Sequence, residues 1–490
     1  MLENKRNSIA KDSFVLMFVK CITLAVGIVQ AMILARTLSK ELYGTYSEAL
    51  LVISFFSPLF SLGLDNAINY FFNKTNDFDC KSNYINTIVF LSGLFGLCGG
   101  IILFICKNVI SAYYGNSEII PIMIYIAFRP CLTNLIALYQ PLYISSGYAR
   151  VIAIRNLVIS ICQVLIIALC SARTDNLTTI FLFLLILDIV QLFFFAQYYG
   201  HNNFHINPFK YKREYIKSIL TYAVPMMLAN AVSTLSINMD NLVISNLMTV
   251  KDYALYTNMS KELPFSFIAA SFTAVVTPQI VKLLSNNKID KFRALWSDYL
   301  EIGYTVTWPL CIGAFLMAPQ LIEILYSTKY LDTQGIIVFR IYTIVAMIRF
   351  TYFGMVPTAL GETKIVFYYS LISLGINMCL NYLFFYLIGM CGPPFATFLS
   401  IVIMGFFYFR RSMLLTKSNF VIVFRLKKAL ILCIEMIIVG VLTIYFNKLI
   451  SLFSLNVIVD FLAGFCFFVG IIFLLKYKDM KRLINNMNKV

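Results

Sequence analysis

The sequence predicts an all-α membrane protein of about fourteen membrane-spanning helices, arranged as two six-helix lobes in tandem followed by two C-terminal helices. Three observations predict this class. Of the 490 residues, 60% are hydrophobic and only 13% are charged, whereas soluble domains carry about 25% charged residues. The apolar residues fall into runs long enough to cross a bilayer, which takes about 20 residues. Lys and Arg gather in alternate segments between those runs.

The apolar runs define the predicted spans. In the first half of the chain they are 14–34, 46–68, 85–106, 119–144, 151–170 and 177–198. A basic segment is followed by 219–247, 253–281, 295–318, 336–360, 365–388 and 391–409, and a second basic segment precedes 429–446 and 455–475. The first run is longer than the apolar region of a signal peptide and lacks a clear cleavage site, so we expect it to be retained.

The basic residues orient these helices. With both termini in the cytoplasm, 27 Lys and Arg fall in cytoplasmic segments and 7 fall on the opposite side. This bias obeys the positive-inside rule, and the loss of one span would destroy the alternation. It also accounts for most of the net charge of +16, so the charge does not indicate a nucleic-acid partner.

A weak internal repeat divides the helices into lobes. The Tyr-x-x-Tyr pattern at 43–46 recurs at 253–256, and Phe-Arg at 128–129 recurs at 339–340. Because six spans is an even number, the two halves would face the same way, as parallel repeats do in one class of transporters. The predicted organisation is an N-terminal lobe (1–200), a cytoplasmic loop (201–217), a C-terminal lobe (218–411), a second loop (412–428), two further helices (429–476) and a cytoplasmic tail (477–490).

Five of the 39 Lys and Arg belong to neither count, and all five lie inside predicted spans: Lys20, Arg129, Lys261, Arg340 and Arg349. A charge at the bilayer centre costs about 2.5–3.5 kcal/mol on insertion scales, so such residues are candidates for function. An arginine side chain binds phosphate through a rigid fork of donors, which makes these residues candidate contacts for an anionic substrate. Alternatively, Lys20 could extend to the interface. Arg340 and Arg349 would lie on opposite faces of a straight helix.

Two acidic residues are candidates for ion coupling or charge pairing. Asp188 lies midway along the sixth span, and Asp240 lies nearer the end of the seventh. Each could pair with an arginine, or bind a proton or Na⁺ that drives transport.

Catalytic, metal and cofactor sites are not indicated. The chain contains two His, no CxxC pair and no GxxxxGK[ST] nucleotide-binding loop. Asp77-Phe78-Asp79 has the form of a sugar-nucleotide motif, but it lies in a short polar loop with no soluble domain around it. We therefore expect a protein that is not an enzyme and needs no cofactor.

Several segments resemble one family. Residues 34–46 (LARTLSKELYGTY) and 62–67 (LGLDNA) resemble the start of bacterial polysaccharide repeat-unit flippases of the O-antigen and capsule type. Residues 240–244 (DNLVI), followed by Tyr253 and Tyr256, resemble their seventh span. This family belongs to the multidrug, oligosaccharidyl-lipid and polysaccharide exporter superfamily.

The resemblance implies a transporter of the bacterial inner membrane. Such a protein would flip undecaprenyl-diphosphate-linked oligosaccharides from the inner to the outer leaflet by alternating access of two lobes, for surface polysaccharide assembly. Its partners would be the lipid-linked substrate, membrane lipids, possible polysaccharide assembly proteins and a possible coupling proton or Na⁺.

Three alternatives stay open. A multidrug antiporter of the same superfamily should hold cations in an acidic cavity, and the buried arginines argue against it. A flippase for the peptidoglycan lipid precursor is closer to the leading interpretation. A membrane polysaccharide polymerase should carry a sizeable outward loop with catalytic residues, whereas no outward loop here exceeds roughly a dozen residues.

Overall fold

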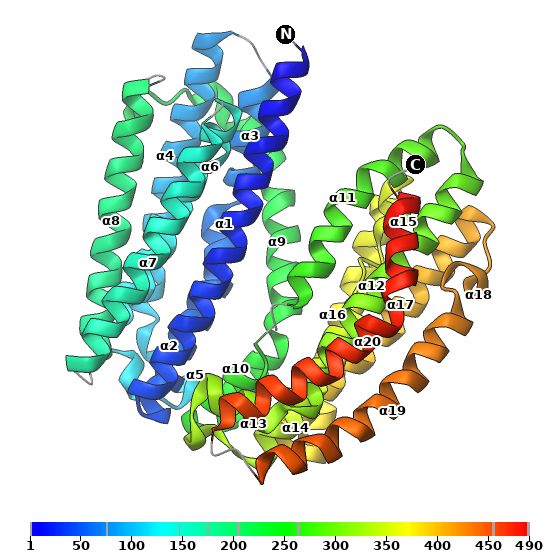
Figure 1. Ribbon diagram of the computed structural model, residues 1–490. Coiled ribbons are helices and arrows are strands. Elements are labelled where there is room, and N and C mark those ends of the chain that lie inside the picture. Colours follow the sequence, from blue (N-terminus) through cyan, green and yellow to red (C-terminus); the bar gives the residue numbers. More distant parts are fainter. Residues whose placement is uncertain are drawn as a thin grey trace. The chain divides into compact units, whose positions relative to one another are not determined.

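The computed structural model describes residues 2–74, 77–146, 148–173, 176–202, 206–261, 265–452 and 456–487. Throughout these ranges every regular element is a helix, which confirms the predicted all-α class (Figure 1). Helices satisfy their own backbone hydrogen bonds, which is what a chain surrounded by lipid requires.

Contacts within the chain divide it into two compact units, Met1–Ala254 and Leu255–Val490. The first contains α1 (Leu2–Thr37), α2 (Lys40–Ser61), α3 (Leu64–Lys74), α4 (Phe78–Ile105), α5 (Lys107–Tyr114), α6 (Met123–Ser145), α7 (Ala149–Arg173), α8 (Leu177–Asn202) and α9 (Arg213–Leu247), with the short turns η1 (Ser117–Ile119) and η2 (Pro208–Lys210). α10 (Val250–Met259) crosses the division. The second contains α11 (Phe265–Ser285), α12 (Ile289–Leu316), α13 (Ala318–Tyr326), α14 (Thr333–Ile348), α15 (Met355–Ala359), α16 (Thr363–Ile388), α17 (Gly392–Thr416), α18 (Phe420–Val423), α19 (Leu426–Ser451) and α20 (Val457–Met487), with η3 (Thr328–Tyr330) and η4 (Gly389–Cys391).

Each predicted span overlaps one helix or two successive helices. In the described part of the chain, eight helical stretches are long and apolar enough to cross a membrane, or ten if two bent pairs are counted. One of the eight, Lys364–Thr416, is itself α16 and α17 joined by η4, at the predicted seam. The other three predicted spans coincide with α6, with α10 and α11, and with α14 and α15.

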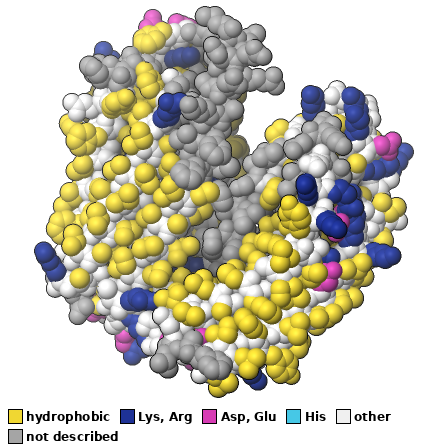
Figure 2. Space-filling view, in the orientation of Figure 1, with side chains coloured by type: hydrophobic (Ala, Val, Ile, Leu, Met, Phe, Trp, Pro, Cys, Tyr) yellow, Lys and Arg dark blue, Asp and Glu magenta, His cyan; other side chains and the backbone are white. Residues whose placement is uncertain are grey.

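Large apolar side chains remain exposed along the helices. Ile105, Phe194, Tyr386 and Leu474 are 73%, 65%, 74% and 78% exposed. On the face drawn in Figure 2, hydrophobic side chains cover much of the surface of each unit. Soluble proteins rarely expose contiguous apolar surface on this scale. The protein is a multi-pass membrane protein, and these surfaces face lipid.

The bend between α2 and α3, which measures 41°, depends on a glycine. Leu62 and Gly63 have φ angles of +48° and +68° at the break. A Cβ atom on Gly63 would lie 2.5 Å from the carbonyl oxygen of Ala223 in α9. Glycine adopts positive φ without the usual steric cost, so this residue permits both the turn and the close approach of α9.

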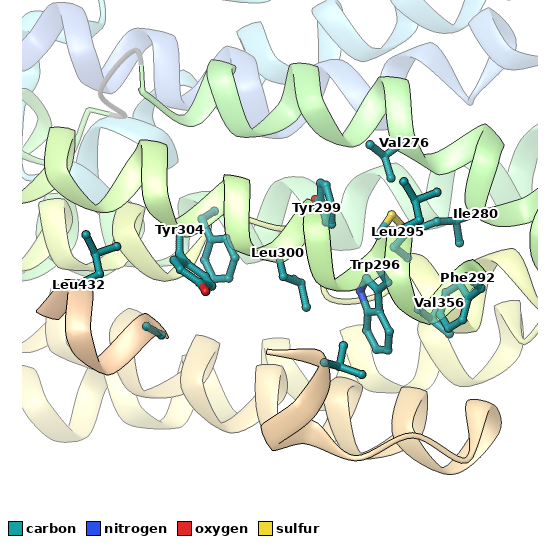
Figure 3. Close-up of a cluster of buried hydrophobic side chains, with 14 of the residues drawn as sticks. Val276, Ile280, Phe292, Leu295, Trp296, Tyr299, Leu300, Tyr304, Val356 and Leu432 are labelled. Atoms are coloured by element: carbon teal, nitrogen blue, oxygen red, sulfur yellow. The ribbon is translucent and has the colours of Figure 1, made fainter. Parts of the chain in front are cut away.

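In the second unit, α12 lies at the centre of the core. Figure 3 shows Trp296, Tyr299 and Leu300 of α12 in the same buried cluster as Val276 of α11 and Leu432 of α19. Both α19 and α20 pack against α12. The two C-terminal helices are therefore part of this core.

Charged residues also join the C-terminal helices to α12. Glu301 of α12 accepts hydrogen bonds from Arg425 and, at 2.5 Å, from Nζ of Lys428. Nη2 of Arg482 in α20 lies 3.5 Å from the same carboxylate. Nη2 of Arg425 also donates to Oδ1 of Asp298 at 2.6 Å. The Glu301 side chain is only 2% exposed, so its buried charge is balanced by three cations.

We predict that Glu301→Gln destabilises the second unit. Loss of one member of a buried charge cluster leaves its partners uncompensated and costs about 3–5 kcal/mol. Thermal unfolding of the purified protein in detergent should show a clear fall in Tm. The matched control is Asp290→Asn, whose ion pair with Arg293 involves a 97% exposed carboxylate and should contribute less than about 1 kcal/mol. Equal Tm values for the two variants would contradict the prediction.

Candidate functional site

Two of the charged residues singled out by the sequence meet inside the first unit. Nε of Arg129 in α6 lies 3.3 Å from Oδ2 of Asp188 in α8. The Asp188 side chain is 2% exposed and that of Arg129 is 18% exposed. Each charge therefore has an opposite charge at hydrogen-bonding distance, which offsets much of the cost of placing it within a span.

The pair is part of a longer polar chain. Gln191, one turn beyond Asp188 on α8, donates from Nε2 to Oδ1 of Asp188 at 2.8 Å. The side-chain oxygen of Gln191 accepts from Nε and Nη2 of Arg155 in α7, at 3.1 and 2.6 Å. The spacing of three residues places Asp188 and Gln191 on one face of α8. The chain Arg129–Asp188–Gln191–Arg155 thus links α6, α8 and α7, and we call it the charge network.

Arg155 corrects the sequence analysis. It is one of the 27 basic residues ascribed to cytoplasmic segments, although its position falls inside the predicted span 151–170. The structure places it within α7, inside the apolar stretch Arg150–Arg173. Its guanidinium also lies 5.3 Å from the centre of the Phe195 ring. A position one turn inside a predicted span does not by itself show whether a basic side chain extends to the interface or faces the protein interior.

Aromatic rings surround the Arg129 end of the charge network. The guanidinium of Arg129 lies 5.2 Å from the centre of the Tyr125 ring, a cation–π distance. Phe181 of α8 stacks on Tyr125 at 4.5 Å and on Tyr46 of α2 at 5.3 Å. The Tyr46 hydroxyl in turn accepts a hydrogen bond from Gln30 of α1 at 3.2 Å. Arg129 is therefore positioned by side chains from several helices.

A polar cavity of about 300 Å³ lies in the same unit. Most of its lining side chains carry a hydroxyl, an amide or a carboxylate: Ser57, Ser61, Asp65, Ser92, Asn134, Asn230, Ser233 and Thr234, together with Pro58, Ala137 and Leu138. Two hydrogen bonds between Ser57 and Asn134 join α2 to α6 at this cavity. The Ser57 hydroxyl donates to Oδ1 of Asn134 at 2.9 Å, and Nδ2 of Asn134 donates to the Ser57 carbonyl at 3.0 Å. The buried Ser92 hydroxyl has no hydrogen-bond partner. Such a lining suits a ligand rich in hydroxyl groups.

Three predicted basic residues lie in the second unit. Nε of Arg340 donates to the carbonyl of Phe315 at 3.2 Å, and its guanidinium lies 5.2 Å from the Phe315 ring centre. Arg349 caps the C-terminus of α14, where the helix breaks before α15. Nζ of Lys261 donates to Oδ1 of Asn258 at 3.2 Å. Because α14 ends at Ile348, the straight-helix argument about opposite faces does not extend to Arg349.

The two remaining candidate site residues from the sequence analysis, Lys20 and Asp240, lie in the first unit. Lys20 is exposed on α1. Asp240 is buried on α9, 5% exposed, and accepts a hydrogen bond from the backbone N–H of Asn241 at 2.9 Å.

Sequence reasoning also missed a buried acid on α2. Glu48 is fully buried, and its Oε2 accepts a hydrogen bond from Nδ2 of Asn116 at 2.7 Å. The same amide nitrogen donates to Oγ1 of Thr45 at 2.8 Å. Oε1 of Glu48 has no hydrogen-bond partner. The sequence signal that could have found it is an acidic residue inside the apolar run 46–68, near the start of the run.

The Asp-x-Asp motif has a local structural role. Asp77 caps the N-terminus of α4, where its carboxylate accepts from the backbone N–H groups of Asp79 and Cys80 at 3.4 and 3.3 Å. Within the residues that the structure describes, no cluster of three or more His, Cys, Asp or Glu side chains could hold a metal ion.

Residues 33–334 match the family described as polysaccharide biosynthesis protein. The protein belongs to the polysaccharide biosynthesis protein family. Over 134 residues it is 22% identical to a probable lipid II flippase MurJ of Bdellovibrio bacteriovorus. That alignment covers 26% of each protein, so the chain matches about a quarter of the length of this relative.

The fold of this family member is similar to two kinds of solved transporter. The lipid II flippase MurJ in an inward closed conformation aligns with a TM-score of 0.73 at 15% identity, covering 95% of this chain and 99% of that one. A multidrug resistance MATE transporter of the MOP superfamily, inward-facing, aligns with a TM-score of 0.64 at 13% identity, covering 81% and 96%. A MOP superfamily transporter from Pyrococcus furiosus aligns with a TM-score of 0.56 at 13% identity, covering 84% and 96%. At these identities the likeness concerns the fold.

We predict that Asp188→Ala lowers the stability of the first unit by about 3–5 kcal/mol, because Arg129 then carries an unbalanced charge within a span. The double variant Arg129→Met with Asp188→Leu should recover most of this loss, since well-packed apolar residues replace buried ion pairs at little cost. Thermal unfolding monitored with a thiol-reactive dye measures both, because unfolding exposes the buried Cys131 of α6. A double variant no more stable than Asp188→Ala would show that the pair is not the source of the effect.

Proposed function

We propose that this protein flips undecaprenyl-diphosphate-linked oligosaccharide repeat units from the inner to the outer leaflet of the bacterial inner membrane. The observation that carries the proposal is the match of residues 33–334 to the polysaccharide biosynthesis protein family. The similarity of the fold to that of the lipid II flippase, over 95% of the chain, supports it. The protein is a transporter for surface polysaccharide assembly, makes no covalent change to its substrate and needs no cofactor.

The polar cavity of the first unit supports a glycan substrate. Its hydroxyl and amide side chains offer both donors and acceptors, which match the hydroxyl groups of a sugar. Arg129 and Lys20 in this unit, and Arg340, Arg349 and Lys261 in the other, are the proposed contacts for the diphosphate. Of the two in the first unit, Arg129 is the better placed, because aromatic rings and Asp188 already orient its guanidinium.

The charge network suggests how binding is linked to conformational change. While Asp188 holds Arg129, the guanidinium is neutralised. An anionic diphosphate that displaces Asp188 would free this carboxylate, which could then take up a proton or Na⁺. Asp188 is therefore one proposed residue for ion coupling. Asp240, which is buried on α9, is the other. This step fits alternating access, in which the substrate binds one conformation more tightly than the other.

The proposed topology has fourteen spans with both termini in the cytoplasm. It combines an N-terminal lobe (1–200), a C-terminal lobe (218–411) and two further helices (429–476), with cytoplasmic loops at 201–217 and 412–428. The excess of basic residues on one side of the predicted spans supports this orientation. Surface polysaccharide assembly proteins are the proposed partners.

A second candidate is transport of the peptidoglycan lipid precursor. The similarity of the fold to that of the lipid II flippase, and the partial match to a probable lipid II flippase, favour this candidate. A multidrug antiporter is less well supported, because the fold similarity to a multidrug transporter covers 81% of the chain rather than 95%.

Deletion of the gene tests the proposal. We expect complete undecaprenyl-linked repeat units to accumulate in the inner leaflet and surface polysaccharide to be lost, because export is blocked after synthesis. Extraction and mass analysis of the undecaprenyl-linked lipids measures this, and a plasmid copy of the wild-type gene is the control. Accumulation of the peptidoglycan precursor would support the second candidate. Normal surface polysaccharide with altered drug sensitivity, and no accumulation of either lipid-linked precursor, would overturn both.

A conservative substitution tests the cavity. Thr234→Val removes one hydroxyl from the polar cavity while keeping the shape of the side chain. One hydrogen bond contributes about 1 kcal/mol, so the KM for flipping of the lipid-linked oligosaccharide in proteoliposomes should rise roughly fivefold. Thr221→Val, at an exposed position on the same helix outside the cavity, is the matched control and should leave the KM unchanged. An unchanged KM for Thr234→Val would exclude this hydroxyl from glycan binding.

A further inference from the structure

The second unit contains an apolar pocket that the proposed transport site does not use. Its volume is about 940 Å³, near the upper end of the roughly 300–1,000 Å³ that small-molecule pockets occupy. Its walls come from α12, from the chain that follows α14, from α17 and from α18. Aromatic rings dominate the lining, among them Trp308, Phe350, Phe353, Phe409, Phe420 and Phe424, and we call it the aromatic pocket.

The walls of the aromatic pocket are held in place by contacts between the rings. Phe420 lies 5.4 Å from Phe409 and 5.2 Å from Phe424, between ring centres. Trp308 lies 6.0 Å from Phe350, and its indole Nε1 donates to the carbonyl of Met347 at 3.0 Å. A pocket with interlocked walls is formed before a ligand arrives, which lowers the entropy lost on binding.

Two basic side chains are among those that line this pocket. Arg410 and Lys417 line it and are exposed. Neither forms an ion pair with an acidic side chain among the described residues. The neighbouring Arg411 differs, because Nε and Nη2 of its guanidinium bind both carboxylate oxygens of Glu362. Arg410 and Lys417 are therefore available to an anion from outside the protein.

A second, basic pocket adjoins the first. Its volume is about 440 Å³, and Arg293 and Arg425 line it. Lys417, Ser418 and Asn419 line both pockets, so the turn that follows α17 separates an apolar space from a basic one.

Arg293 fixes this turn. Its Nη2 donates to the carbonyls of Thr416 and Lys417 at 2.9 and 2.8 Å, and its Nε donates to the Ser418 hydroxyl at 3.0 Å. Lys417 itself has a φ of +48° and caps α17. The turn that lines both pockets therefore has a defined shape.

We propose that the two pockets hold one anionic phospholipid of the cytoplasmic leaflet. An acyl chain enters the aromatic pocket, and the phosphate binds Arg410 and Lys417, of which Lys417 also lines the basic pocket. An apolar cavity next to unpaired cations matches an amphiphile that has an apolar chain and an anionic head. In the proposed topology α17 ends at the cytoplasmic face, where anionic lipids attract basic residues. The inference uses that topology and does not depend on which molecule is transported.

The two tryptophans of the chain make the site measurable. Trp308 lines the aromatic pocket, whereas Trp296 is buried in the core and 3% exposed. The Trp296→Phe protein therefore has a single tryptophan, in the pocket, which is excited selectively at a wavelength that tyrosine does not absorb. It is reconstituted at full length in phosphatidylcholine vesicles that contain a minor fraction of phosphatidylglycerol with brominated acyl chains. Parallel vesicles contain the same fraction of brominated phosphatidylcholine. Bromine quenches a tryptophan that it touches, so we expect stronger quenching by the anionic lipid.

Charge variants show whether the head group is recognised. Lys417→Gln and Arg410→Gln should each reduce the preference for phosphatidylglycerol roughly fivefold, the usual effect of one basic residue near a membrane surface. Lys427→Gln is the matched control, because this exposed residue lines neither pocket. Equal quenching by the two lipids, or an unchanged preference in both charge variants, would overturn the proposal.

Competition identifies the occupant. Excess unbrominated phosphatidylglycerol should relieve the quenching. If a small amount of polyprenyl phosphate relieves the quenching and the same amount of phosphatidylglycerol does not, the occupant is a polyprenyl lipid. This outcome would overturn the proposal. If Trp296→Phe does not fold, the wild type is compared with Trp308→Phe, in which the lipid-specific quenching must disappear. Flipping of the lipid-linked oligosaccharide is measured in the same vesicles, so a failure of the proposed function is seen separately from a failure of lipid binding.

Discussion

The absence of water around the spans constrains every part of this structure. Lipid offers no hydrogen bonds, so each backbone N–H and carbonyl must find a partner within the protein. Helices meet this demand along their length, and the described chain forms helices throughout. Two breaks show how protein groups meet this demand. At Gly63 the backbone turns directly against α9, close to the Ala223 carbonyl. At the turn after α17, the guanidinium of Arg293 binds the carbonyls of Thr416 and Lys417.

The same constraint explains why charges within the helices occur in groups. In the first unit, Arg129, Asp188, Gln191 and Arg155 form a continuous chain across three helices. In the second, three cations surround the buried Glu301 and join α12 to the C-terminal helices. Each grouping lowers the cost of a charge in a low-dielectric medium by an opposite charge or a hydrogen bond. The two groups differ in their surroundings. Arg129 lies among aromatic rings in the unit that contains the polar cavity, and it is the one we connect with transport.

The fold class and the positions of the spans could be predicted because hydropathy is a local property. The seam at 389–391, for example, falls where the sequence places it, since glycine and proline interrupt an otherwise continuous apolar run. The candidate site was predicted less completely. Arg129 and Asp188 stand out as charges in apolar runs. Arg155 was ascribed to the cytoplasmic side and Glu48 was not singled out. Both lie near the start of their runs, 151–170 and 46–68, and only the packing of neighbouring helices shows that they face the protein interior.

By itself, then, the sequence determined the medium, the helical class, the approximate ends of the helices and the resemblance to polysaccharide flippases. The tertiary structure alone decided which charges are paired, which hydroxyl and amide groups share a cavity, and where an apolar pocket adjoins unpaired cations. The physical reason is distance along the chain. Hydropathy is a sum over about twenty consecutive residues. The contacts that make these sites join Arg155 to Gln191 across 36 residues, and Arg425 to Glu301 across 124. Such contacts depend on how helices pack, which no local pattern records.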